Sequence, residues 1–224
     1  MTSLEIDCAG EKLRLHPEKA IHWPAANMLI VADLHFGKPA AFRASGIGVP
    51  ESTTAADLDR LAKLLRETKA TRLVICGDFM HAAKGMQPVM TAALEKWRAE
   101  HARVEMILVT GNHDQLCDPL PNAWNIVDAG LSWHCKPFVF THAPGTSKSG
   151  YVIAGHLHPA IVLRETFGPS VRAPAFWFGE RGAVLPAFGS FTGMHPIRPE
   201  RRDRVFAVGS GEIIQALPRN HTST

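Results

Sequence analysis

Aspartate, asparagine and histidine side chains, which bind divalent metal ions, directly follow five short apolar runs of this sequence. A short apolar run bounded by glycine and polar residues predicts a β-strand that is buried on both faces. In open α/β sheets, ligand sites form just beyond the carboxyl ends of such strands. We therefore predict one metal site assembled from Asp33-Leu34-His35, Gly77-Asp78, Gly111-Asn112-His113-Asp114, His142 and Gly155-His156-Leu157-His158.

The side chains in these segments suit a pair of divalent metal ions. Asp33 and His35 are two residues apart, as are His156 and His158, and on extended backbone such pairs point the same way. Asp78 offers two oxygens and is suited to bridge two metals. Two carboxylates offset only part of the charge of two divalent ions, so the site would attract a phosphate ester. Metals about 3.5–4 Å apart would activate a bridging hydroxide for in-line attack on phosphorus.

Two neighbouring residues in the third segment, His113 and Asp114, are predicted to be catalytic rather than to bind metal. An imidazole with a reference pKa of about 6.5 suits proton donation to the leaving oxygen. The alternative for His113 is a hydrogen bond to a phosphate oxygen of the substrate. Asp114 is expected to fix the tautomer of His113, as carboxylates beside metal sites often do.

Composition indicates an ordinary globular protein, and we expect residues 1–224 to form a single domain. The chain has 224 residues, of which 46% are hydrophobic and 20% charged, with a net charge of +3. Its longest apolar stretch of about six residues is too short to span a membrane, and we see no secretory signal. The four cysteines show no CxxC pairing, which fits a reducing cytoplasm better than a disulfide framework.

The amino-terminal half predicts alternating strands and helices. Residues 4–15 alternate apolar and polar around a Gly turn, which indicates a β-hairpin. Residues 36–50 are rich in Gly, Pro and Ala, and we expect a loop there. A helix is predicted over residues 54–69, with Thr54 and Asp57 as a capping pair.

A second helix is predicted over residues 88–101, so that strands and helices alternate up to residue 114 and the strands should be parallel. Beyond Trp124 short β-runs recur, including residues 183–187 and 205–208. The carboxyl half is therefore expected to form a second, mostly antiparallel sheet packed on the first.

In their order along the chain, the five metal-binding segments resemble the motif set of the calcineurin-like binuclear metallophosphoesterases. The match spans residues 33–158, and the fold that it implies is an α/β two-sheet αββα sandwich. By this resemblance, one metal would be held by Asp33, His35, Asp78 and His158, and the other by Asp78, Asn112, His142 and His156.

A narrower resemblance is to the bacterial subfamily of ligase-associated DNA damage response endonucleases. It rests on residues 33–38, on Phe42-Arg43-x-x-Gly46 and on residues 188–193. It implies manganese-dependent cleavage of DNA, chiefly single-stranded, general phosphodiesterase activity, and association with a DNA ligase, a helicase and a nuclease. The family commonly has Asp or Asn three residues after the Gly-Asp aspartate, and this chain has His81 there.

The donor set and the remaining polar groups refine this hypothesis. Mixed nitrogen and oxygen ligands without a thiolate favour Mn²⁺ or Fe²⁺ as cofactor, with Zn²⁺ also compatible. Lys38 and Arg43 are candidate substrate-binding residues, the alternative being a solvated loop face. His81 either lines the site or packs beneath it. Residues 198–204 are rich in arginine, and we favour an exposed turn there over a contact with nucleic acid. Residues 176–178 could stack on bases, but we favour a core strand.

Three functions are therefore weighed. The first is a DNA endonuclease, and the second is a small-molecule phosphoesterase acting on a cyclic nucleotide or a pyrophosphate. The third is a scaffold that has lost its metals and serves only protein contacts. Every ligand position is filled in this chain, which disfavours the scaffold.

Overall fold

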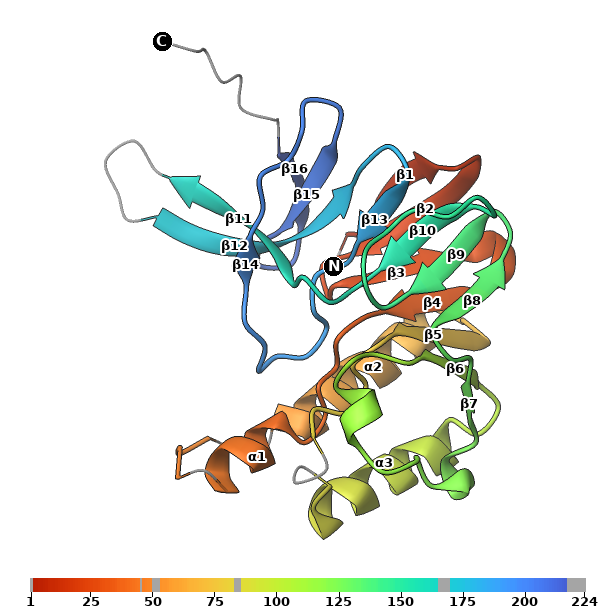
Figure 1. Ribbon diagram of the computed structural model, residues 1–224, viewed down its shortest axis with the longest axis vertical. Coiled ribbons are helices and arrows are strands. Elements are labelled where there is room, and N and C mark those ends of the chain that lie inside the picture. The colour runs from red at the N-terminus through yellow and green to blue at the C-terminus, as the bar shows by residue number, and fades with distance from the viewer. Residues whose placement is uncertain (1, 45, 50–52, 83–85, 165–169, 217–224) are drawn as a thin grey trace.

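The computed structural model describes residues 2–44, 46–49, 53–82, 86–164 and 170–216. Two β-sheets pack face to face, and the α-helices lie along the outer face of the first sheet (Figure 1). The predicted α/β two-sheet sandwich is confirmed. None of the described helices is both long and apolar enough to span a bilayer.

The first sheet has seven strands in sequence order, with β1–β4 antiparallel and β4–β7 parallel. The predicted hairpin is its first strand pair. The strands are β1 (Leu4–Cys8), β2 (Glu11–His16), β3 (Ala20–Trp23), β4 (Met28–Val31), β5 (Arg72–Cys76), β6 (Glu105–Val109) and β7 (Ile126–Asp128).

The second sheet is mixed, and most of its strand pairs are antiparallel, as predicted. The central β10 instead runs parallel to both of its neighbours, β9 and β13. The strands are β8 (Ser132–Cys135), β9 (Phe138–Thr141), β10 (Tyr151–Ala154), β11 (Pro159–Arg164), β12 (Ser170–Phe178), β13 (Gly182–Val184), β14 (His195–Pro196), β15 (Arg204–Val208) and β16 (Ile213–Ala216).

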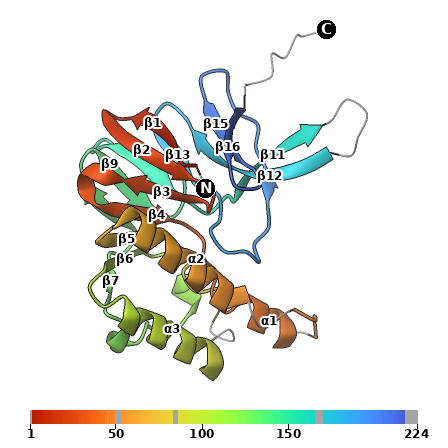
Figure 2. The same cartoon turned by 180° about the vertical axis from the view of Figure 1, so that it is seen from behind.

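Among the described residues, the α-helices α1 (Lys38–Ala44), α2 (Thr53–Thr68) and α3 (Pro88–Glu100) join strands of the first sheet. The same ranges contain the short 3₁₀ helices η1 (Pro24–Ala26), η3 (Asp114–Leu116) and η4 (Asn122–Trp124). Seen from behind in Figure 2, α2 lies against the first sheet. Its Leu58, Leu61 and Leu65 are buried against that sheet, each contributing roughly 1.5–3 kcal/mol by burial.

The expected loop over residues 36–50 is wrong, because α1 occupies its first half. Gly, Pro and Ala together suggest a loop, but Ala is the strongest helix former and Pro is favoured in a first helical turn. The helix over residues 54–69 is confirmed as α2, whereas the capping role of Asp57 is wrong. That carboxylate contacts Arg60 and Ser190 instead.

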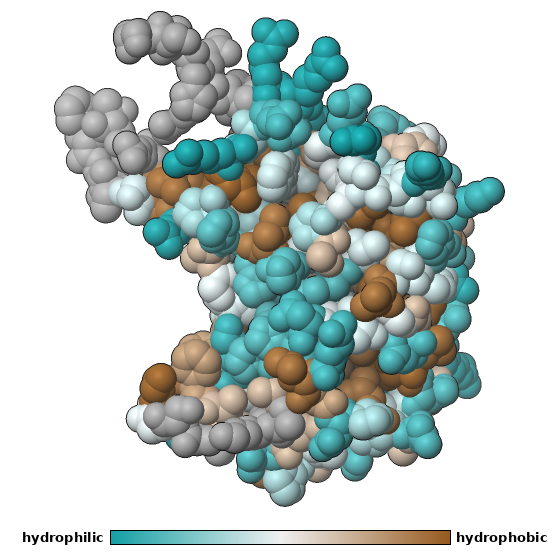
Figure 3. Space-filling model, viewed as in Figure 1, coloured by the Kyte–Doolittle hydropathy of each residue, from teal (hydrophilic) through white to brown (hydrophobic). Residues whose placement is uncertain are grey.

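The carboxyl ends of β4, β5 and β6 and those of β9 and β10 meet along one edge of the sandwich. Backbone hydrogen bonds continue the pairing past the strand ends, from the Asp33 amide to the Gly77 carbonyl (3.1 Å) and from the Gly155 amide to the His142 carbonyl (3.0 Å). The five metal-binding segments therefore start from one rigid edge. The molecule is hollowed between α1, which begins three residues after His35, and the β11–β12 hairpin, which begins one residue after His158 (Figure 3).

Candidate metal centre

Asp33, His35 and His158 form the first of three groups of ligand atoms at the edge of the sandwich, the third of which contains His35, His81 and His113. His35 Nε2 lies 3.2 Å from His158 Nε2, which in turn lies 3.6 Å from Asp33 Oδ1. These three residues come from segments 123 positions apart, yet their donor atoms converge on one point.

The second group contains Asp78, His142 and His156, and Asn112 joins it. His142 Nε2 lies 2.9 Å from Asn112 Oδ1 and 3.0 Å from His156 Nδ1. The structure thus brings all seven predicted ligands together in two neighbouring groups.

Asp78 lies between the first two groups. Its Oδ2 is 3.6 Å from His35 Nε2 in the first group, and its Oδ1 is 3.5 Å from His142 Nε2 in the second. One carboxylate oxygen therefore faces each group, which is the arrangement expected of a residue that bridges two metals.

The donor atoms fit divalent cations. Ligand atoms bound about 2.0–2.2 Å from one cation lie roughly 3 Å from each other, and the nitrogen pairs His35–His158 and His142–His156 have this spacing. His142 Nδ1 lies 3.2 Å from the Cys76 carbonyl oxygen, to which it can donate its proton, so that Nε2 keeps a free lone pair for a metal.

Burial sets the protonation of the site. Asp33 and Asp78 are 0% and 2% exposed. Burial, followed by the neighbouring His158, lowers the pKa of His35 to about 2, so this imidazole is neutral and able to ligate at pH 7. Burial also raises the pKa of Asp78. A cation in the site would oppose this shift and favour the ionised carboxylate.

Five of the ligands have left-handed backbone conformations: Asp33 (φ 55°), His35 (φ 49°), Asp78 (φ 50°), His156 (φ 73°) and His158 (φ 48°). Non-glycine residues rarely adopt this region, and such strain gathers at functional sites. Asp33 and His35 do converge on one group, as predicted, whereas His156 and His158 belong to different groups, so the prediction for that pair is wrong. The extended backbone assumed for both pairs is also wrong. They lie beyond the strand ends, where tight turns rather than extended backbone direct them.

The motif glycines make room for ligand side chains. A Cβ on Gly77 would overlap the His142 ring, and a Cβ on Gly111 would overlap the Asp78 carboxylate. A Cβ on Gly155 would lie 2.6 Å from Asp33 Oδ2. Each glycine therefore admits a ligand from a different segment, a role that sequence reasoning missed.

His113 lies beside the first group, its ring centroid 4.9 Å from that of His35. His113 Nδ1 is 2.7 Å from the His81 carbonyl oxygen, and the His81 ring stacks on His113 at 4.7 Å between ring centroids. His81 Nδ1 also lies 3.3 Å from His35 Nδ1. His81 therefore lines the site rather than packing beneath it, and burial lowers its pKa to about 4.

Asp114 does not contact His113 as expected, and the predicted tautomer-fixing role is wrong. Its carboxylate accepts hydrogen bonds from the backbone amides of Met80 (2.9 Å) and Gly111 (2.8 Å). It thereby joins the loop that follows β5 to the loop that follows β6. The tautomer of His113 is set by the His81 carbonyl, a backbone group that no residue pattern reveals.

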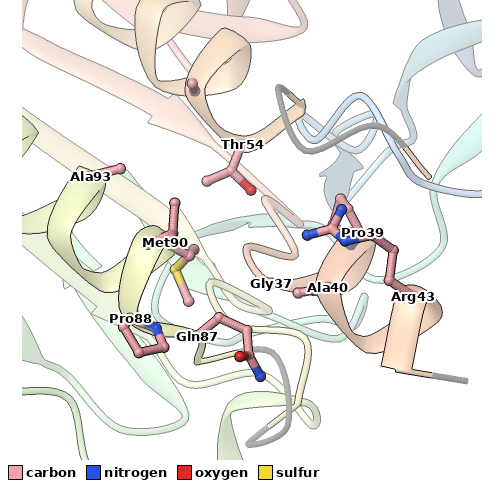
Figure 4. Close-up of a pocket in the computed structure, with 11 residues that line it drawn as sticks. Gly37, Pro39, Ala40, Arg43, Thr54, Gln87, Pro88, Met90 and Ala93 are labelled. Carbon is pink, nitrogen blue, oxygen red and sulfur yellow. The ribbon is translucent and has the colours of Figure 1, made fainter. Parts of the chain in front are cut away.

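The two candidate substrate-binding cations lie on α1. Lys38 begins the helix directly after the first metal-binding segment, and burial lowers the pKa of its ammonium group. Arg43 donates to the Val49 carbonyl (3.0 Å) and lines a cavity of about 440 Å³ among α1, α2 and α3. Figure 4 shows the Arg43 guanidinium and the Thr54 side chain both pointing into this cavity.

Residues 176–178 belong to the core strand β12, with Phe176 and Phe178 buried and the Trp177 indole donating to Asp203. The favoured core interpretation is therefore the one that the structure shows. Residues 201–202 form an exposed turn between β14 and β15.

A comparison with protein families matches residues 26–172 to the calcineurin-like phosphoesterases. Among solved structures, a Pseudomonas putida nuclease, MPE, is 36% identical with a TM-score of 0.84, and the match covers 95% of this chain and 100% of that chain. The Escherichia coli phosphoesterase YfcE is 13% identical with a TM-score of 0.40, over 86% of this chain and 99% of that one. No curated protein matches the chain.

This protein belongs to the calcineurin-like phosphoesterase family. It is therefore a hydrolase of phosphate esters, from a family that depends on a binuclear metal centre. Its clustered aspartate and histidine side chains are the groups able to hold such metals.

Proposed function

We propose that this protein is a DNA endonuclease that requires divalent metal ions, with Mn²⁺ as the preferred cofactor, and acts on single-stranded DNA in repair. The observation that carries this proposal is the 36% identity to the P. putida nuclease over 95% of the chain. The resemblance of residues 33–38, of Phe42-Arg43-x-x-Gly46 and of residues 188–193 to the ligase-associated subfamily supports a cellular role beside a DNA ligase, a helicase and a nuclease.

Seven side chains would hold the metals in this proposal. When bound, two divalent cations would supply positive charge that offsets the negative charge of the phosphodiester, and Lewis acidity that lowers the pKa of water. Nitrogen and oxygen donors without a thiolate suit Mn²⁺, and also Fe²⁺ or Zn²⁺. One metal would be held by Asp33, His35, Asp78 and His158, and the other by Asp78, Asn112, His142 and His156.

His113 would donate a proton to the leaving oxygen. Its Nδ1–H donates to the His81 carbonyl, so the proton for the leaving group is the one that the imidazolium form carries on Nε2. The stacked His81 ring prevents the imidazole from turning away. Asp114 would act indirectly, because its hydrogen bond to the Gly111 amide fixes the loop that carries His113.

Lys38 would position the substrate. It follows His35 by three residues, and the charge of Asp78 attracts its ammonium group, which opposes the effect of burial on the pKa of Lys38. An ammonium group in this position can attract a phosphate oxygen to the metal centre. His81, which burial keeps neutral at pH 7, can donate or accept a hydrogen bond beside it.

The test is incubation of the purified protein with Mn²⁺ and with single-stranded DNA, duplex DNA, a cyclic nucleotide or a nucleotide pyrophosphate. We expect rapid cleavage of single-stranded DNA and loss of at least about 100-fold in rate for Asp78→Asn, with metal content measured in parallel. Asp59→Asn, a neutralised exposed carboxylate on α2, is the matched control. Turnover confined to the small esters would replace the DNA assignment with the small-molecule phosphoesterase.

A further inference from the structure

A cavity of about 230 Å³ adjoins the metal centre, and His158 forms part of its wall. One side is the segment of residues 185–194 that links β13 to β14 (Figure 1). This segment contains the sequence motif Phe188-Gly189-Ser190-Phe191-Thr192-Gly193, to which the metal chemistry assigns no role. The other side contains Lys19, from the turn between β2 and β3, and Arg172 of β12.

The segment is fixed to the metal centre by backbone contacts. The Gly189 amide donates to the Asp33 carbonyl (3.2 Å), and a Cβ on Gly189 would overlap the Leu34 carbonyl. The Phe188 amide donates to the Ala32 carbonyl (2.8 Å). The cavity wall and the first metal-binding segment therefore form one rigid unit.

Lys19 keeps hydrogen-bonding capacity for a ligand. Within the described part of the chain its ammonium has one hydrogen-bond partner, the Gly189 carbonyl at 3.3 Å. The nearby acids Glu18 and Asp57 are both hydrogen-bonded to Arg60, each at 2.7 Å. Burial and the charge of Arg60 lower the pKa of Lys19 to about 8, which indicates an ammonium that has lost much of its hydration.

Arg172 adds a second positive charge to the same cavity. Its side chain is exposed and has no hydrogen bond or ion pair among residues 2–44, 46–49, 53–82, 86–164 and 170–216. Among the described residues the cavity wall contains no acidic side chain. The charge of the wall therefore complements an anion.

We propose that this cavity is a subsite for a second phosphate of the substrate strand, adjacent to the phosphate that is cleaved. The inference rests on the proposed function and names the part of the DNA that the site recognises. His158 belongs both to the metal centre and to the cavity wall, so the two phosphates belong to neighbouring nucleotides. The cavity lies on one side of the centre, so it holds a phosphate on only one side of the scissile bond.

The test compares three substrates with Mn²⁺: a deoxydinucleoside monophosphate, the same dinucleotide with a 5′-terminal phosphate, and the same dinucleotide with a 3′-terminal phosphate. We expect one of the two phosphorylated forms to have a kcat/KM roughly tenfold above that of the unphosphorylated form, as a charge-assisted contact provides. Lys19→Met and Arg172→Gln should each bring this ratio toward one. For long single strands, a plot of the logarithm of the binding constant against the logarithm of the salt concentration has a negative slope. Each substitution should make this slope shallower by about 0.7.

Lys12→Met, which removes an exposed lysine charge on β2, is the matched control and should leave the ratio unchanged. Equal kcat/KM for all three substrates would overturn the subsite while leaving the nuclease intact. The subsite would also be overturned if Lys19→Met and Arg172→Gln lowered cleavage of all three substrates equally, because a purely structural role of the two residues predicts that result. If none of the three dinucleotides nor longer DNA is cleaved, the proposed function fails and the subsite with it.

Discussion

The Asp57 carboxylate on α2 accepts a hydrogen bond of 2.9 Å from the backbone amide of Ser190, although 133 residues separate the two in the sequence. The same carboxylate accepts one of 2.7 Å from Arg60, whose guanidinium also donates to the Phe188 carbonyl at 3.1 Å. Because Gly189 packs on the Asp33 loop, α2 holds in place one wall of the metal centre.

We expect Asp57→Ala to destabilise the protein by about 2–3 kcal/mol, because it leaves the Ser190 amide without an acceptor and removes one of the two carboxylates paired with the partly buried Arg60. Urea unfolding monitored by fluorescence measures this loss. Asp59→Ala removes an exposed carboxylate from the same helix and should change stability by less than about 0.5 kcal/mol. Equal stabilities for the two variants would show that the Asp57 contacts do not support the fold.

Replacement of His113 should have an effect that depends on the leaving group. As a general acid, His113 contributes most when the leaving oxygen is basic, so His113→Gln should slow cleavage of DNA by about 10²–10⁴-fold. A nitrophenyl phosphodiester, whose leaving group needs no proton, should lose far less. Metal content should survive, because His113 Nδ1 donates to a carbonyl and the seven proposed ligands remain. Equal losses on both esters would assign His113 to phosphate positioning.

The Gly155→Ala variant should lose metal affinity before it loses its fold. The new Cβ would lie 2.6 Å from both Asp33 Oδ2 and Ala32 Cβ, so the Asp33 carboxylate must move. Such overpacking costs about 1–3 kcal/mol, and here part of that cost displaces a ligand. Titration with Mn²⁺ followed by calorimetry measures the affinity. Gly145→Ala, where the added Cβ meets nothing within 4 Å, is the control, and equal Mn²⁺ affinities would refute the steric role of Gly155.

The sequence was sufficient to predict the sheets, the helices α2 and α3 and the convergence of the metal-binding segments. Apolar periodicity reports burial, and burial in strands fixes where their polar ends meet. Prediction from the sequence failed for α1, because Pro39 and Ala40 were interpreted as loop residues although both suit a first helical turn.

The remaining errors concern contacts that no local pattern encodes. Asp57 and Asp114 both have hydrogen-bond partners chosen by tertiary structure, namely the Ser190 amide and the Met80 and Gly111 amides. The left-handed conformations of the ligands were equally hidden, because a sequence shows which residues avoid φ > 0 but not which are forced into it.

The pH dependence of stability should depend on His22, a buried residue of β3. Burial, with smaller effects of His16 and Arg14, lowers the pKa of His22 from 6.5 to about 4. The unfolded chain therefore binds a proton at His22 below pH 6.5, whereas the folded chain does so only near pH 4. The contribution of His22 to the free energy of unfolding is therefore fully present above pH 6.5 and is lost as the pH falls toward 4.

Between pH 7.5 and pH 5.0 this loss should be about 2 kcal/mol, because each pH unit below 6.5 costs about 1.4 kcal/mol. His22→Leu removes the titrating group, so the variant should lose about 2 kcal/mol less than the natural protein over this interval. Urea unfolding of both metal-free proteins at the two pH values makes the comparison, in which the effect of the metal-binding histidines cancels. The same pH dependence in both proteins would mean that His22 accepts its proton without cost in the folded state.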